Sequence, residues 1–401
     1  MNKSLDYSSD YIFFFIGAFF ALLANLFLGY HNLEDLGLFN KAYALFIIFG
    51  HLFLFSIHEN LVKNLTLEKN RTKYLSSIFF ILLCTIAFCI LIFFIINFFD
   101  IGKNLFFGIN FLLFSISIPV FIFNKVLFAV LNGDKKFHLY FFLNNLRPVL
   151  IFAILIVIYL NKINITIVFL ICEILILLIN LVLYKKFNIT IKINLIDFFL
   201  VKKIAVFNFL SLPHSLLSYS FLRIDIIVLS FFVDLKTLGF YSFSSMIIEG
   251  IYQLLSMMRD RVNPELSRSL ASKSYKIKTY FKKSLFNVLI FIFIFIILYF
   301  IFFPLFSNFS NKEFILSRNI FCIISIGLFI FSLSSVMEHI FLMNNKPIYQ
   351  SAYIILGNLL NIILNVTLIK IYGVYGAAIA TSISYSVLSL IIFYYSLKIS
   401  K

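Results

Sequence analysis

The amino-acid sequence predicts an all-α polytopic membrane protein with twelve transmembrane helices, and three observations lead to this prediction. First, 62% of the 401 residues are hydrophobic and only 12% are charged, whereas soluble chains are about 45–50% apolar and about 25% charged. Second, twelve apolar runs are each long enough to cross the hydrocarbon, which takes about 20 residues. Third, the connections between these runs alternate between rich and poor in Lys and Arg.

The predicted spans leave little of the chain for anything else. The first run has no small-residue cleavage signal after it, so we expect it to be retained as a span. Because no connection is long enough to form a soluble domain, the function must belong to the membrane helices themselves. In chain order the spans cover residues 11–29, 39–57, 76–99, 105–131, 140–160, 165–184, 204–233, 239–258, 284–305, 319–342, 352–370 and 375–397.

The basic residues predict the orientation of the chain. Of its 33 Lys and Arg residues, 23 fall in the termini and connections of one side, 7 on the opposite side, and 3 inside spans. Since basic residues mark the cytosolic side, we expect a multi-pass protein of the bacterial inner (cytoplasmic) membrane with cytosolic N- and C-termini. Short basic loops beside anionic headgroups explain the net charge of +16, so we expect no nucleic-acid partner.

A short motif recurs about half a chain later. The segment Leu33-Glu-Asp-Leu-Gly-Leu-Phe39 matches Leu235-Lys-Thr-Leu-Gly-Phe-Tyr241, and each precedes an apolar span. We interpret this as a duplication into two six-helix bundles, 1–190 and 191–401, joined by a cytosolic linker at about 185–203. Because six spans per half is an even number, a pseudo-twofold axis along the membrane normal would relate the halves, a layout typical of alternating-access transporters.

Three cations lie inside predicted spans, at Lys125, Arg147 and Arg223. An intramembrane charge costs about 2.5–3.5 kcal/mol to insert, so it tends to face a cavity or a partner. We interpret all three as candidate substrate-binding cations of a central lumen. Arg223, near the midplane, could instead form a structural ion pair. Arg147 and Lys125 are closer to the cytosolic loops and could snorkel to the interface.

Three acids are candidates for ion coupling or for ion pairs, namely Asp225, Glu249 and Glu338. Arg223 and Asp225 are two residues apart on a helix, so they point in different directions and each needs its own partner. Glu249 could carry a coupling proton, pair with Arg223 or Asp225, or remain a protonated structural residue. Glu338 is near the cytosolic end, where an interfacial role is the alternative.

Several expectations concern what the chain does not use. The four cysteines stand apart in apolar spans, so we interpret them as small buried hydrophobes, with no disulfide, metal site or cofactor. The Gly373-x-x-Gly376 pair follows no strand and precedes no Gly-Lys-Ser/Thr, and no Walker A motif occurs elsewhere, so no ATP-driven pump is expected.

Two stretches carry a resemblance to a known family. One runs from Arg223-Ile-Asp225 through Leu238-Gly239-Phe-Tyr241 to Asn263-Pro-Glu-Leu-Ser267. The other runs from Asn358-Leu-Leu-Asn361-Ile-Ile-Leu-Asn365 through Gly373-Val-Tyr-Gly376 to Ser384. In these stretches, in length and in its two-half layout, the chain resembles the Wzx-type polysaccharide flippases (O-antigen or capsule repeat units) of the multidrug/oligosaccharidyl-lipid/polysaccharide exporter superfamily.

The resemblance implies a V-shaped bundle of six plus six helices that opens alternately to the two sides. It further implies translocation of an oligosaccharide linked to undecaprenyl pyrophosphate from the cytosolic to the outer leaflet, without enzymatic activity. Arg147 and Arg223 are the cations that match the implied role of holding the pyrophosphate. The implied partners are that lipid-linked oligosaccharide, membrane lipids, a proton or sodium ion, and a polysaccharide polymerase with its chain-length regulator.

Two other functions compete with this interpretation. An ion-coupled drug or cation antiporter of the same superfamily would use an acidic cluster in one half, but Glu173 is the single acid well inside a span of the first half, and no partner for it can be assigned. A polyprenol-dependent membrane glycosyltransferase or polymerase could use Glu34 and Asp35 as acidic catalysts. Those enzymes have a large outer loop, and the longest outer connection here, about 306–318, is short.

The predicted topology can be tested by single-cysteine labelling. Cysteines introduced within 63–73 and 259–283 should react with a membrane-impermeant maleimide only after the cytosolic face is opened. Labelling of either segment in intact spheroplasts would contradict the orientation.

Overall fold

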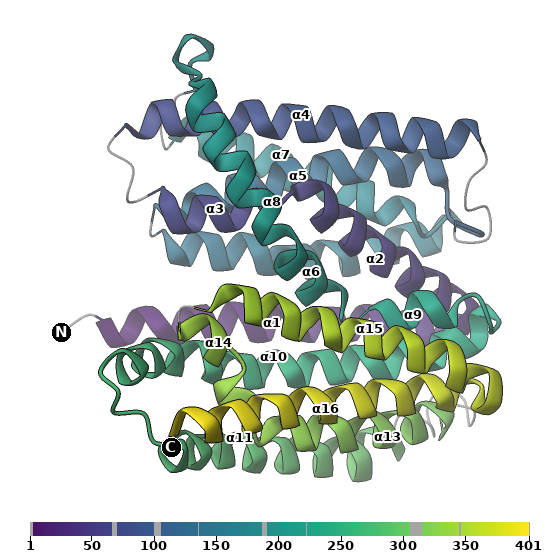
Figure 1. The fold of residues 1–401 in the computed structure, drawn as a ribbon. Helices are drawn as coiled ribbons and strands as arrows, with labels where there is room; N and C mark the ends of the chain where they lie inside the picture. The colour runs from purple at the N-terminus through teal and green to yellow at the C-terminus, as the bar shows by residue number, and fades with distance from the viewer. Residues whose placement is uncertain are drawn as a thin grey trace. The chain divides into compact units, whose positions relative to one another are not determined.

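The computed structural model describes residues 3–65, 70–99, 106–134, 136–186, 191–221, 223–304, 315–344 and 346–400, and every regular element in these ranges is helical (Figure 1). The chain divides into two compact units. Unit 1 comprises Met1–Phe27 with Lys41–Tyr219, and unit 2 comprises Leu28–Asn40 with Ser220–Lys401. The all-helical fold class is confirmed, while the division at residue 190 stays a prediction.

Most of the N-terminal helices belong to unit 1, and the first turns of α2 are counted with unit 2. Within unit 1, α5 packs against α3, α4, α6 and α7 and forms its centre. The helices are α1 (Lys3–His31), α2 (Leu33–Leu54), α3 (Ile57–Asn64), α4 (Arg71–Phe98), α5 (Phe111–Gly133), α6 (Phe137–Leu160), α7 (Ile167–Lys186), η1 (Ile193–Leu195) and α8 (Phe198–Ser220).

Unit 2 is built around α16, which packs against both α13 and α15 (Figure 1). The long helix α10 also packs against α13. The helices are α9 (Ile224–Leu229), α10 (Leu235–Ala271), α11 (Ile277–Ile297), η2 (Leu298–Phe302), α13 (Ile315–Ser332), η4 (Ser335–Met337), α14 (Ile340–Met343), α15 (Pro347–Tyr372) and α16 (Val374–Ser400).

Ten helices of the described residues are long and apolar enough to cross a membrane, and α7 contributes a shorter apolar stretch, Ile167–Leu183. The predicted span 239–258 lies within α10, which is 37 residues long and therefore about 55 Å, well beyond the ~30 Å hydrocarbon. Its first turns are buried inside unit 2, so they do not need an apolar surface facing lipid. The remainder of α10 carries the basic segment that begins at Arg259.

Three spans that the sequence predicts as single helices are interrupted. The predicted span 39–57 breaks between α2 and α3, where Phe55 (φ 51°) and Ser56 (φ 52°) are left-handed. The predicted span 204–233 breaks between α8 and α9, eight residues beyond Pro213, through which α8 continues. The predicted span 319–342 divides into α13, η4 and α14. Periodicity could not predict these breaks, because polar residues such as Arg223 and Glu338 occur near them but do not mark where a helix must end.

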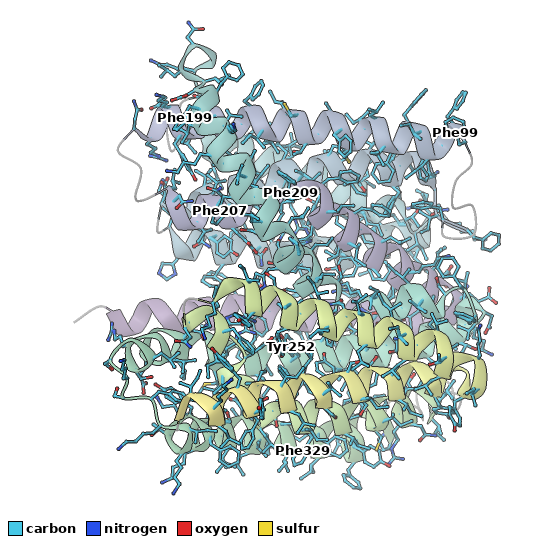
Figure 2. The ribbon with its side chains drawn as sticks, viewed as in Figure 1. Phe99, Phe199, Phe207, Phe209, Tyr252 and Phe329 are labelled. Carbon is cyan, nitrogen blue, oxygen red and sulfur yellow. The ribbon has the colours of Figure 1, made fainter. Side chains whose placement is uncertain are left out.

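The distribution of side chains fits a lipid environment. Large apolar residues are exposed on the outside of each unit, such as Phe199 at 80% and Phe99 at 65%, and Figure 2 shows both at the periphery of unit 1. Many serine and asparagine side chains are buried instead. In water these exposed side chains would form unusually large apolar patches. Between lipid chains their exposure costs no free energy, so this surface supports a multi-pass membrane protein.

The two repeated motifs lie against each other inside unit 2. A Cβ atom on Gly37 would lie 1.9 Å from the carbonyl oxygen of Leu235, and one on Gly239 would lie 2.5 Å from that of Leu33. Both distances are too short for any side chain, so the starts of α2 and α10 cross backbone to backbone. Glycine at both positions is what permits this crossing.

A pair of glycine substitutions in α10 tests the crossing. Gly239→Ala should lower the melting temperature of the purified protein, because its Cβ meets a backbone carbonyl that cannot rotate away. Gly250→Ala is the matched control, since a Cβ there meets nothing within 4 Å, and it should stabilise the helix by about 0.5–1 kcal/mol. Equal effects of the two substitutions would contradict the close contact.

Candidate functional site

Unit 1 contains a buried ion pair between two neighbouring helices. Arg147 on α6 donates from Nε to Oε1 of Glu173 on α7 at 2.6 Å and from Nη2 to Oε2 at 3.3 Å. The side chains are 6% and 1% exposed. The guanidinium also lies 5.0 Å from the ring centre of Phe121. This forked geometry is the strong form of an Arg–carboxylate contact, and it gives Glu173 the partner that sequence reasoning could not assign.

Lys125 on α5 extends this group into a cluster with an excess of positive charge. Its Nζ donates to Oδ1 of Asn144 at 3.1 Å and lies 5.6 Å from the Phe121 ring. Among the described residues, no carboxylate lies within ion-pair distance of Lys125. Two cations and one carboxylate leave the cluster at +1. Asn124 completes it by donating to the Glu173 carboxylate at 2.9 Å.

Two histidines lie beside this cluster, and sequence reasoning missed both. His51 on α2 is 2% exposed, and its ring stacks on Tyr219 of α8 with centroids 3.7 Å apart. His58 on α3 lies 5.9 Å from His51, centroid to centroid. In the described part of the chain, Nε2 of His51 and Nδ1 of His58 are buried without a hydrogen-bond partner. The break at 55–56 brings these residues together, and no motif in the sequence marks that break.

Unit 2 contains a second arginine–carboxylate pair. One Nη2 group of Arg223 donates to both oxygens of Glu249, at 2.6 and 2.7 Å, and the side chains are 10% and 17% exposed. Arg223 is positioned by the interruption between α8 and α9, since it occupies the N-cap of α9. Of the roles open to Glu249, pairing with Arg223 is therefore observed. A substrate-binding role for Arg223 stays a prediction.

Asp225 has its own set of partners, as its spacing from Arg223 predicts. Its carboxylate accepts hydrogen bonds from the hydroxyl of Tyr241, from Oγ1 of Thr381 at 3.2 Å and from the backbone N–H of Ile226 at 2.8 Å. Asn361 on α15 extends the network toward Thr381 of α16 at 3.4 Å. Asp225 is thus a buried acid of unit 2 that hydroxyl groups, not a cation, hold in place.

Glu338 lies between η4 and α14 and joins them to α10. It accepts hydrogen bonds from Arg259 and, at 2.8 Å, from the hydroxyl of Tyr252, which Figure 2 labels in the interior of unit 2. Arg259 and Glu338 are 12% and 13% exposed. An ion pair is therefore observed for Glu338 as well, and any role in coupling stays a prediction.

Two sequence-based placements are wrong. Lys41, counted among the seven basic residues of the outer side although it lies at the start of the predicted span 39–57, is buried at 3% exposure inside α2, because that helix begins at Leu33 and includes it. Cys84, interpreted as a buried hydrophobe, is exposed on the surface of α4, where large apolar residues of the same helix are exposed as well. The balance of charge could have suggested the partner of Glu173: a buried acid needs a cation, and Lys125 and Arg147 are the candidates on the adjacent spans.

The oxygens around Asp225 are the ones best suited to a hard cation. Carboxylate and hydroxyl oxygens are typical ligands of such ions, and Asp225, Tyr241 and Thr381 bring both kinds together. Within the same residues, no group of three or more His, Cys, Asp or Glu side chains converges as a transition-metal site would require.

The fold is that of known membrane transporters. A lipid II flippase, MurJ, in an inward closed conformation aligns over 98% of this chain and 89% of its own, with a TM-score of 0.76 and 19% identity. An inward-facing multidrug resistance MATE family transporter of the MOP superfamily aligns over 96% and 94%, with a TM-score of 0.71 and 14% identity. The MATE multidrug transporter DinF-BH aligns over 98% and 94%, with a TM-score of 0.61 and 16% identity.

At these identities the likeness concerns the fold alone. No known family profile matches the sequence, and no curated protein does. The chain therefore has the helical fold of MOP-superfamily transporters, and its function must be inferred from its own residues.

The pair in unit 1 generates a stability prediction. Arg147→Met alone should destabilise the protein by about 3–5 kcal/mol, because it leaves Glu173 buried without its cation. The double variant Arg147→Met with Glu173→Leu should recover most of that loss, since two apolar residues replace the pair. Thermal unfolding in detergent measures both. A double variant no more stable than the single one would contradict the pairing.

Proposed function

We propose that this chain is a flippase that moves oligosaccharide repeat units linked to undecaprenyl pyrophosphate from the cytosolic to the outer leaflet of the inner membrane. A pyrophosphate headgroup cannot cross hydrocarbon unaided, because its charges are too costly there. It needs cations and hydrogen-bond donors at membrane depth, while its lipid tail stays in the bilayer. The fold shared with a lipid II flippase supports the proposal without specifying the substrate.

The observation that carries the proposal is the charge excess around Lys125. Arg147 is neutralised by Glu173 at 2.6 Å, whereas among the described residues the polar partner of the Lys125 ammonium is the neutral oxygen of Asn144 at 3.1 Å. A phosphate oxygen would be a stronger partner than a carboxamide, because it carries a negative charge that attracts the ammonium, and this attraction is large where water is scarce. The cluster is thus suited to an anion that arrives and leaves.

We propose that Arg223 and Arg147 also bind the substrate, but not as free cations. Each already holds a carboxylate, so each would have to share its guanidinium with the substrate. A guanidinium has five N–H donors, and Arg223 uses a single nitrogen for both oxygens of Glu249. A phosphate that displaced this carboxylate, or shared the guanidinium with it, would be bound in the forked geometry that Lys cannot reproduce.

Coupling to an ion is the remaining part of the proposal. Asp225 is the first candidate, because hydroxyl groups surround its carboxylate and a proton or sodium ion could bind there. Glu249 and Glu338 would bind a coupling ion only by giving up the arginines with which they are paired. We further propose alternating access by two six-span halves related by a pseudo-twofold axis, for which the repeated motifs at 33–39 and 235–241 are the support.

A drug or cation antiporter is the second candidate, and the likeness to MATE transporters favours it. An antiporter of cationic drugs needs an acid that is available to a cation. In unit 1 the carboxylate of Glu173 already accepts three hydrogen bonds from Arg147 and Asn124. The positive excess of that cluster therefore favours an anionic substrate over a cationic one.

Substitution of Lys125 tests the proposal. In cells that lack the chromosomal copy, Lys125→Met should lower surface polysaccharide by about 10- to 100-fold, the equivalent of one lost charged hydrogen bond of roughly 1.5–3 kcal/mol. Lys125→Arg should retain activity, because the charge remains. Lys162→Met, at an exposed loop position, is the matched control.

Immunoblots of the membrane fraction establish that the variants insert, and removing an unpaired intramembrane cation should not impair insertion. Normal polymer from Lys125→Met would contradict the proposal. Unchanged polymer together with a loss of drug resistance would favour the antiporter.

A further inference from the structure

A hollow of about 340 Å³ lies at the far end of α10, roughly 28 Å along that helix from Glu249. The last turns of α10, the connection that follows and the first turn of α11 form it. Its polar lining includes Arg268, Ser269, Ser272, Ser274, Lys276 and Thr279. We propose that this hollow binds the phosphate group of a membrane lipid, as a site separate from the transported substrate.

The backbone of the connection brings the two cations together. Lys273 is left-handed, with φ 53°, and closes the end of α10 by donating to the carbonyl of Leu270 at 3.2 Å, while the backbone N–H of Ser274 donates to that of Ser269 at 2.9 Å. The chain therefore reverses sharply, and Lys276 returns toward Arg268. The same bonds occupy the last carbonyls of α10, which would otherwise repel an anion.

The lining carries a positive charge that no described acid offsets. Glu265 is the acid of the hollow, and its carboxylate is paired with Lys283. Among the residues that the structure describes, Arg268 and Lys276 have no carboxylate within ion-pair distance. The hollow therefore offers an anion two cations whose charges are not already used.

Neutral donors surround those cations. The hydroxyl of Ser272 donates to the carbonyl of Arg268 at 2.9 Å and is hydrogen-bonded to that of Ser274 at 2.7 Å, so both would turn toward a bound anion. The hydroxyl of Thr279 belongs to the same lining. Lys276 is the N-cap of α11 and provides no side-chain hydrogen bond to that helix, and both Lys276 and Thr279 line the hollow, so the positive end of a 21-residue helix dipole lies at its edge. Cations, hydroxyls and a helix N-terminus together are the recognition set of a phosphate.

The surface next to the hollow indicates a lipid as the source of the phosphate. Beyond its first two turns, α11 exposes Phe286 (53%), Leu289 (64%) and Phe293 (66%) along its length. The first of these lies about 10 Å along the helix from Thr279. Acyl chains could therefore lie against α11 while the headgroup occupies the hollow, an arrangement that a free phosphate ion does not need.

The test uses the purified full-length protein in detergent, titrated with short-chain phosphatidylglycerol and monitored by native mass spectrometry. Arg268→Gln and Lys276→Gln should each weaken binding about fivefold, and together about 25-fold, as expected for lost interfacial cations. The matched control is Lys278→Gln with Lys282→Gln, which removes the same charge from exposed positions of α11 outside the hollow. It should leave binding unchanged.

Two outcomes would overturn the proposal. An equal loss in the control variant would mean that a diffuse basic surface attracts the lipid. Displacement of the lipid by inorganic phosphate at millimolar concentration, with the same dependence on Arg268, would assign the hollow to a free anion. Melting curves recorded without lipid establish that the variants are folded. If the double variant does not fold, lipid binding by Lys276→Gln alone, a change at an exposed position, tests the proposal.

Discussion

The structure depends on the pairing of charge inside an apolar fold. In the described part of the chain, three arginine–carboxylate pairs away from the surface, Arg147–Glu173, Arg223–Glu249 and Arg259–Glu338, each join segments that are separate in the sequence. A single unpaired member of such a pair costs several kcal/mol when water cannot reach it. Each pair therefore fixes which helices must be neighbours, in a way that non-directional apolar contacts do not. Packing then fills the space around these fixed points.

The interrupted helices have the same physical cause. A break within an apolar span frees backbone N–H and C=O groups, which are tolerated at membrane depth only where other polar groups surround them. Arg223 and Asp225 lie at the break before α9 and in its first turn, and Glu338 lies at the break before α14. His51 and His58 flank the break after α2. The polar side chains and the breaks therefore occur together, and the candidate site is a product of both.

Much of the fold could be predicted from the sequence, because apolar length and the charge of connections are local properties. The ten apolar helices and the all-helical class follow from them. The breaks could not be predicted, since the polar residues between 204 and 233, such as Asn208, Pro213 and Arg223, are spread along the run and do not single out the point where α8 ends. Buried Lys41 was missed because α2 begins at Leu33, within a connection whose Glu and Asp suggest a loop.

The candidate site shows the same division between local and non-local information. Arg223, Arg147 and Glu249 could be identified from their depth in apolar runs. Their partners could not, because a pair such as Arg147 with Glu173 depends on the relative rotation and tilt of two helices. His51 gave no signal at all in the sequence. A lone histidine in an apolar run is ordinary until the fold places Tyr219 against its ring at 3.7 Å.

The length of α10 has a mechanical consequence. The helix is unbroken from Leu235 to Ala271, so it acts as a stiff lever of about 48 Å between Gly239 and its far end. With the glycine crossing as fulcrum, a tilt of about 5° displaces that end by roughly 4 Å. Motions too small to disturb the crossing are thereby amplified at the opposite surface.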